Sequence, residues 1–249
     1  MTPVVKQLLI INIIFFIGAQ IVPISYEYFS LFYPESDQFR IWQIITHMFM
    51  HARWPNFAHI LFNMFALYSF GSALEHFWGG KKFLFFYISC GLGAALVNFA
   101  VNYYFYQDSL NILIANGFHK ADILSLLNDG KIDTRWQQIL TVSEFKHFTE
   151  AYLGTVVGAS GAIYGLLVAF TFMFPNAELG IMFIPIPIKA KYFVPIYMLL
   201  FDGFFGIFGS SFMGIESGIA HYAHIGGAFF GFMIMWYWKK NQFNKNRWN

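Results

Sequence analysis

Six stretches of this chain are each long and apolar enough to cross a lipid bilayer as a helix. The hydrocarbon core is about 30 Å thick, so a spanning helix needs about 20 mainly apolar residues. Of all residues 57% are hydrophobic and only 11% are charged, whereas soluble domains carry roughly a quarter charged residues. Lipid must therefore be the main solvent. We expect the spanning helices at residues 8–24, 57–77, 83–106, 151–174, 193–208 and 219–238.

These stretches predict an all-α polytopic membrane protein that forms a single domain over residues 1–249. The first stretch has some likeness to a secretion signal. Its apolar run is longer than the usual span of about 7–15 residues, however, and few basic residues precede it. We therefore expect it to be retained as a helix.

The distribution of Lys and Arg predicts the orientation, because these residues are enriched in cytoplasmic loops. One side of the predicted bundle carries nine of them and the other carries six, four of which lie in one long loop. The richer side includes a short tail at residues 239–249. We expect this tail and both termini to be cytoplasmic.

Three connections between the helices have distinct characters. Residues 25–56 are half apolar, so we expect this outer loop to lie in the membrane interface or against the bundle. Residues 107–150 form an extracytoplasmic insertion that contains two segments of helical apolar spacing. Three prolines between residues 175 and 191 exclude a regular helix across the middle of a cytoplasmic connection.

Several classes of function lack the residues that they need. The net charge of +2, without a basic run, argues against nucleic-acid binding. Cys90 is the single cysteine, which excludes an intrachain disulfide and a cysteine zinc site. There is no His-Glu-x-x-His motif, no phosphate loop and no pair of intramembrane aspartates. His47 and His51 have a spacing that could bind a metal ion, but they lack acidic or cysteine neighbours.

Four polar residues lie inside the predicted helices, where lipid makes them costly. His59 and Asn63 are four residues apart and share one helical face. Ser160 lies early in the fourth helix and His224 lies early in the sixth. The three helices start on the same side of the membrane, so these side chains have a similar depth. Each residue alone is also compatible with helix packing or interhelical hydrogen bonding.

Small residues beside the serine and the histidine predict close helix packing. The spacings Gly161-x-x-x-Gly165 and Gly227-x-x-x-Gly231 let two membrane helices approach each other. Close approach is also what a serine on one helix needs to reach a histidine on the other. The packing and catalytic interpretations are therefore compatible.

The residue types permit a specific chemistry. A serine hydroxyl becomes a good nucleophile when a histidine takes its proton, as His224 could do for Ser160. Ring N–H, amide N–H and backbone N–H groups can then stabilise an oxyanion. We interpret Glu75 and Asp202 as loop or interhelix partners. No carboxylate is obviously placed to orient the histidine, so we expect a Ser–His dyad and not a triad.

Three motifs together resemble one known family. The segments HILFN (residues 59–63), GASGAIYG (158–165) and AHIGG (223–227) lie in this order on helices two, four and six of a six-helix core. This combination resembles the rhomboid intramembrane serine proteases. The resemblance runs from about residue 39 to residue 231, and the stretch ALEHFWGGKKF after the second helix is also similar to the family.

The resemblance implies a role for each motif residue. Ser160 would be the nucleophile, and His224 would be the base and later the acid. His59 and Asn63, with the Ser160 backbone N–H, would form the oxyanion site. Tyr164 would stack against the ring of the catalytic histidine. The supporting small residues of the motifs would be Gly158, Gly161, Gly227 and Gly231.

The resemblance also implies substrates and a location. The family cleaves transmembrane proteins near their outer end, through an acyl-enzyme and without a metal or cofactor. Helix five and the loop at residues 209–218 would form a lateral gate. We expect the inner membrane of a bacterium, with the active site open to the outer side and the bilayer as the surrounding partner.

Two features depart from the family pattern. Trp42-Gln43 stands where many relatives carry Trp-Arg, which leaves the anchoring of the first outer loop open. The insertion at residues 107–150 is longer than the six-helix core needs, and it could bind substrate, cover the site, or do neither. Nothing in the sequence points to an oligomeric state.

Two rival interpretations remain. One is a catalytically inactive relative that binds transmembrane clients. The other is a small-solute transporter, which would place charges or broken helices at the membrane midplane. The polar set lies near one face instead, which argues against transport.

Overall fold

The computed structural model describes residues 1–181, 184–198, 200, 202 and 221–242. Within these residues the chain is mainly helical and contains a single two-stranded sheet. Two described helices are long and apolar enough to cross a membrane, α1 (Pro3–Ile21) and α6 (Gly80–Ala115). A shorter apolar helix is α9 (Ser160–Met173). Of the fifth predicted helix, at residues 193–208, the part after residue 198 lies outside the described residues except for 200 and 202.

The second predicted helix is present as one continuous helical run. It consists of α4 (Ala58–Ala66), a π-helical turn η2 (Leu67–Gly71) and α5 (Ser72–Trp78). Near its end, the carboxylate of Glu75 accepts hydrogen bonds from the backbone N–H groups of Val4 (2.9 Å) and Val5 (2.8 Å). These bonds satisfy donors in the first turn of α1, which has no earlier helical partner for them. Glu75 is therefore an interhelix partner, as predicted.

The outer loop before this run folds into short helices. These are α2 (Ser25–Phe29), α3 (Gln43–Thr46) and the 3-10 turn η1 (His47–Phe49). Its backbone pairs with a distant segment, because Leu31 and Val156 exchange two N–H···O bonds of 3.0 and 2.9 Å. The loop thus lies directly against the chain that leads to Ser160.

The third predicted helix extends further than its apolar stretch. Residue 107, the expected start of the insertion, lies inside α6, which continues to Ala115. No proline interrupts residues 107–115, and a helix leaving the bilayer can carry polar residues such as Gln107 and Asp108. The chain turns at Gly117, whose φ of 90° suits glycine. The rest of the insertion contains α7 (Lys120–Asn128), the 3-10 turn η3 (Thr134–Gln138) and α8 (Val142–Leu153).

The fourth predicted helix, at residues 151–174, was placed too early. Residues 151–153 end α8, residues 154–159 are not helical, and α9 begins at Ser160. The intervening segment contains the β-branched run 155–157, which favours extended backbone. Gly158 follows with a φ of 121°, a conformation that side-chain-bearing residues rarely adopt. Apolar composition alone could not distinguish this extended entry from a helix.

The proline-rich connection forms a hairpin, which confirms the prediction that it is not helical. Strands β1 (Glu178–Ile181) and β2 (Ile184–Lys189) pair antiparallel, with Glu178 opposite Lys189. The chain then enters α10 (Ala190–Met198). The last described helix is α12 (His221–Gln242), predicted at residues 219–238. Residues 243–249 of the predicted tail lie outside the described residues.

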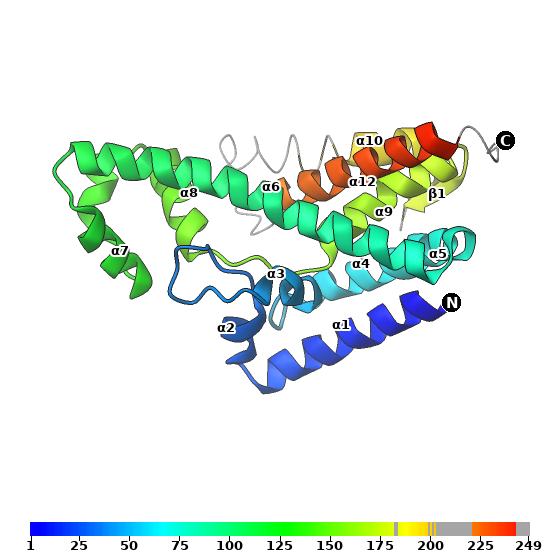
Figure 1. The fold of residues 1–249 in the computed structure, drawn as a ribbon, viewed down its shortest axis with the longest axis horizontal. Coiled ribbons are helices and arrows are strands. Elements are labelled where there is room, and N and C mark those ends of the chain that lie inside the picture. The colour runs from blue at the N-terminus through cyan, green and yellow to red at the C-terminus, as the bar shows by residue number, and fades with distance from the viewer. Residues whose placement is uncertain (182–183, 199, 201, 203–220, 243–249) are drawn as a thin grey trace.

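Glycines set the contact between α9 and α12, which lie side by side with α6 (Figure 1). A Cβ on Gly227 would overlap the carbonyl oxygen of Gly161, and one on Gly231 would come within 2.7 Å of the Gly165 Cα. A Cβ on Gly161 would lie 2.5 Å from the Ala94 Cβ of α6. The backbones of three helices therefore approach as closely as glycine permits.

The described residues form two hydrophobic cores. The first lies in the bundle, and its largest buried side chains include Phe83, Phe86 and Tyr87 of α6. The second lies in the insertion, at the far end of α6 (Figure 1), and combines aromatic rings with leucine and isoleucine side chains. Trp136, Phe148 and Tyr106 are fully buried there. The insertion thus has a core of its own.

Candidate active site

Ser160 is the first residue of α9 and its hydroxyl faces α12. The segment before it is held in place by the Gly158 N–H, which donates to the carbonyl oxygen of His47 (2.9 Å). The Ile163 N–H donates to the Ala159 carbonyl at the start of the helix (3.0 Å). N–H groups in the first turn of a helix lack intrahelical partners, and they carry the positive end of the helix dipole. The serine therefore lies where backbone donors are available to an anion.

His224 approaches Ser160 from α12. The serine Oγ and His224 Nε2 are 2.8 Å apart, a normal hydrogen-bond distance. The imidazole stacks on the ring of Tyr164, one turn along α9, with centroids 4.2 Å apart and planes 12° from parallel. Stacking leaves the ring edge, and so both nitrogens, free to form hydrogen bonds. Two helices that are far apart in sequence thus present a hydroxyl and a base to each other.

Asp202 also belongs to this cluster, although the sequence led us to interpret it as a loop or interhelix partner and not as a site residue. Its Oδ1 lies 2.8 Å from His224 Nδ1, and the carboxylate is buried. The expectation that no carboxylate orients His224 was wrong. An ionised carboxylate only accepts hydrogen bonds, so the imidazole donates from Nδ1 and its Nε2 is left to accept from the serine. The cost of an aspartate inside a membrane helix was the sequence signal that could have identified it.

His221 shares the same carboxylate. Its Nδ1 also lies 2.8 Å from Asp202 Oδ1, and it precedes His224 by three residues on α12. The two histidine rings are nearly perpendicular, with an angle of 87° between their planes. Asp202 therefore binds two histidines that lie on one face of α12.

His59 lies beside the entry to α9. A Cβ on Gly158 would come within 2.9 Å of His59 Cε1, so the glycine makes room for this ring. The Ala52 N–H approaches His59 Nδ1 at 3.4 Å. His59 also faces His51, with ring centroids 5.3 Å apart. The structure therefore brings His59 to the segment that carries Ser160.

Asn63 lies one turn further along α4. Its Nδ2 donates to the carbonyl oxygen of His59 (2.7 Å), and its side chain is buried. An amide has two N–H donors, so this bond leaves one donor for another partner. The described contacts of Asn63 are with its own helix, and they do not join it to the Ser160 hydroxyl.

His47 and His51 are held by backbone groups. The Nδ1 atoms lie 2.8 Å from the Gln43 carbonyl for His47 and 3.2 Å from the Phe49 carbonyl for His51. Burial lowers the pKa of His47 to about 4 and that of His51 to about 3, so both are neutral near pH 7. Among the described residues, neither belongs to a group of three or more metal-ligating side chains. Their positions favour a structural role.

Gln43 anchors the outer loop in place of the arginine that many relatives carry. Its Nε2 donates to the carbonyl oxygens of Glu27 and Gln38, both at 3.0 Å, and its Oε1 accepts from the Arg40 N–H (3.0 Å). The neighbouring Trp42 donates from Nε1 to the Tyr28 carbonyl (2.8 Å). Gln43 is fully buried, so the loop is fixed by a neutral side chain.

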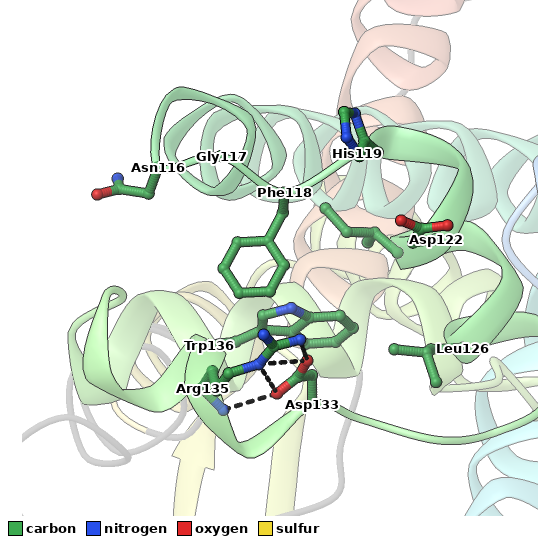
Figure 2. Close-up of a pocket in the computed structure, with 10 residues that line it drawn as sticks. Asn116, Gly117, Phe118, His119, Asp122, Leu126, Asp133, Arg135 and Trp136 are labelled. Carbon is green, nitrogen blue, oxygen red and sulfur yellow. Dashed lines mark hydrogen bonds and ion pairs between the residues drawn. The ribbon is translucent and has the colours of Figure 1, made fainter.

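A separate pocket lies in the insertion (Figure 2). It has a volume of about 310 Å³ and is lined by residues of 116–136, including Phe118, Asp133 and Arg135. The hydrogen-bonded Arg135 guanidinium holds the pKa of Asp133 below its usual value. These charges neutralise each other, and the pocket contains none of the residues around Ser160. The predicted lateral gate at residues 209–218 lies outside the described residues.

Comparisons with known proteins agree with the three sequence motifs. The family model described as the Rhomboid domain matches residues 38–121 and 134–241. Over 223 residues the chain is 26% identical to an uncharacterized mitochondrial rhomboid protein of Schizosaccharomyces pombe, covering 81% of this chain and 52% of that protein. A stretch of 63 residues is 32% identical to the rhomboid protease GluP of Bacillus subtilis, covering 25% of this chain and 12% of that protein. The chain spans about half the length of the yeast relative.

Proposed function

Because this chain belongs to the rhomboid family of membrane-embedded proteins, we propose that it is an intramembrane serine endopeptidase. Ser160 is the nucleophile and His224 is the general base. The observation that carries the proposal is the 2.8 Å contact between Ser160 Oγ and His224 Nε2. The name of the GluP relative, a rhomboid protease, supports the same class of activity.

The acylation step follows from the hydrogen-bond directions around His224. Asp202 accepts the Nδ1 proton, so Nε2 takes the proton of Ser160 as Oγ attacks the scissile carbonyl. The carboxylate stabilises the imidazolium that forms, and Asp202 is therefore a positioning residue. The imidazolium then protonates the leaving amine, the C–N bond breaks, and an acyl-enzyme remains. Water hydrolyses the ester by the same proton transfers and restores the serine.

The oxyanion forms beside donors from two helices. The Ser160 backbone N–H belongs to the first turn of α9, and the side chains of His59 and Asn63 supply ring and amide N–H groups. Loss of one such donor typically lowers the rate by about 10²–10³-fold. One N–H of Asn63 is bonded to the His59 carbonyl, and its second N–H is the donor that this proposal assigns to the oxyanion.

The expected substrates are transmembrane segments that are cut near their outer end. Ser160 and His224 lie in the first turns of α9 and α12, whose starts the Lys and Arg distribution assigns to the non-cytoplasmic side. A bacterial inner membrane with both termini in the cytoplasm fits that distribution. We also propose that a substrate segment enters the site laterally from the bilayer, between two helices of the bundle.

Site-directed variants test the proposal in liposomes that contain a transmembrane reporter. Ser160→Ala and His224→Ala should each lower cleavage by at least about 1,000-fold. A fluorophosphonate probe should label the wild type and not Ser160→Ala. Cleavage that survives both substitutions contradicts the proposal. Absence of cleavage and of labelling in the folded wild type favours the inactive client-binding relative instead.

Asp202 has its own test. Asp202→Asn should lower kcat on the order of 100-fold or more with little change in KM, because the wrong imidazole tautomer faces the serine. Asp202→Glu should restore part of kcat, since it keeps an anionic acceptor. A purely structural role for Asp202 predicts instead that both variants lose thermal stability and kcat together.

A further inference from the structure

Three metal-ligating side chains converge on the side of His224 that faces away from Ser160. Asp202 Oδ1 lies 2.8 Å from both His221 Nδ1 and His224 Nδ1. One ligand atom from each residue can be chosen so that all three lie within 4.8 Å of one another. We propose that Asp202, His221 and His224 form a site for Zn²⁺ or a similar divalent transition metal, and that the bound ion switches the protease off. The inhibitory part rests on the proposed function, whereas binding itself does not.

The geometry of the cluster suits zinc. Zinc binds histidine nitrogens at about 2.0–2.1 Å and carboxylate oxygens at about 2.0–2.2 Å, and it commonly takes three protein ligands and one water. The two histidines lie three residues apart on one turn of α12, so they share a helical face. Both Nδ1 atoms lie 2.8 Å from the same Asp202 oxygen, and the two ring planes are nearly perpendicular. An ion between these three atoms replaces two hydrogen bonds with three metal–ligand bonds.

The ligand set also favours transition metals over hard cations. Imidazole nitrogen binds zinc, copper or nickel, whereas calcium and magnesium prefer sites made of oxygen atoms. One carboxylate supplies a negative charge against the double charge of the ion. The side chains of His221 and His224 retain 12% and 11% exposure, so the cluster is not sealed inside the bundle.

Metal binding and catalysis make opposite demands on Nδ1 of His224, because the metal needs this nitrogen without a proton and catalysis needs it protonated. In the metal-free state His224 carries its proton on Nδ1 and accepts the serine proton at Nε2. A metal on Nδ1 requires the neutral ring to carry its proton on Nε2. The ring then donates to Ser160 Oγ and cannot act as its base. No proton leaves the neutral imidazole in this exchange, because the proton moves from Nδ1 to Nε2. The ion is therefore an inhibitor and not a cofactor.

The first experiment measures binding without any need for activity. Purified full-length Ser160→Ala protein in detergent is titrated with ZnCl₂ by calorimetry, and the zinc environment is measured by X-ray absorption. We expect one site with two nitrogen ligands. Adding His221→Asn or Asp202→Asn should weaken binding at least tenfold, whereas adding His76→Asn, at an exposed histidine of α5, should not. Unchanged affinity in both ligand variants overturns the proposal.

The second experiment measures inhibition of reporter cleavage by ZnCl₂, with each variant compared with its own metal-free rate. Zinc should inhibit the wild type, EDTA should restore the rate, and magnesium should have no effect at the same concentration. The half-inhibitory zinc concentration should rise at least tenfold in His221→Asn and stay unchanged in His76→Asn. An equal concentration in wild type and His221→Asn overturns the inhibitory role. If the metal-free wild type does not cleave while Ser160→Ala still binds zinc, the proposed function has failed and the metal site has not.

Discussion

The bundle and the insertion differ in how closely their helices approach each other. In the bundle, α12 meets α9 through Gly227 and Gly231, where helix backbones touch. In the insertion, the space between helices is filled by large rings such as Trp136 and Phe148, whose planes meet at 83°. Water drives the burial of apolar surface, but lipid gives little such driving force between helices. Each region is thus packed in the way that its expected surroundings favour, which are lipid for the bundle and water for the insertion.

This difference explains why the candidate site lies in the bundle. The short side chain of Ser160 can reach His224 because the backbones of α9 and α12 approach closely, and glycine contacts provide that approach. The insertion is better suited to forming a stable surface outside the membrane.

The largest expected effect comes from Gly227→Ala. The new Cβ would overlap the Gly161 carbonyl oxygen, so α9 and α12 must separate. We expect a loss of about 3 kcal/mol or more in stability and at least a tenfold loss of activity, because Ser160 and His224 move apart. Thermal unfolding in detergent and reporter cleavage measure the two effects. Gly18→Ala in α1 is the matched control, since a Cβ there meets nothing within 4 Å. If the two variants behave alike, close glycine packing is not essential.

Trp136→Ala should affect the other region. Removal of a fully buried tryptophan costs about 3–5 kcal/mol, which is enough to open a small core. Limited proteolysis should then cut within the insertion, while the bundle keeps its unfolding temperature. Val142→Ala, at a side chain that is 89% exposed, serves as the control. Loss of both regions in one transition would show that the two cores are not independent.

Gln43→Ala tests the loop that joins the two regions. The substitution leaves the Arg40 N–H and two carbonyl oxygens without their buried partner. Such losses cost about 1–3 kcal/mol, and the thermal unfolding temperature should fall accordingly. The exposed Gln38→Ala should be neutral. An equal result for the two variants would mean that the loop is anchored elsewhere.

The smallest effect is a pH dependence of the insertion. Hydrogen bonds from Thr141, the backbone N–H first, hold the pKa of Glu144 below its ordinary value of 4.5. A lowered folded-state pKa adds stability above the unfolded value and loses it as pH falls through the folded value. Protease resistance of the insertion should therefore decline as the pH falls below 4.5 and through the lower folded-state pKa of Glu144. Glu144→Gln should flatten this decline, and an unchanged slope would exclude the capping carboxylate as its source.

Much of the bundle could be predicted because its constraints are local. Apolar length indicates membrane helices, and the four-residue glycine spacing indicates the face along which α9 and α12 meet. The start of α9 could not be predicted, because a β-branched run in an apolar stretch is compatible with helix or extended chain. The structure settles the choice through the pairing of Val156 with Leu31, which is distant in sequence.

The candidate site was predictable only in part for the same reason. Ser160, His224 and His59 lie in motifs that can be recognised one at a time. Asp202 lies in no motif, and its partners are 19 and 22 residues away on another helix. Its contact with His224 depends on how distant parts of the chain pack together, and no local sequence pattern encodes that packing.

The uninterrupted length of α6 has a further consequence. At 1.5 Å per residue its 36 residues extend about 54 Å, well beyond the roughly 30 Å of hydrocarbon. The same rigid rod that packs against α12 therefore also holds the aromatic core of the insertion at a set height from the bilayer. Because one helix runs through both regions, the insertion is held at a fixed distance from the bundle that carries Ser160.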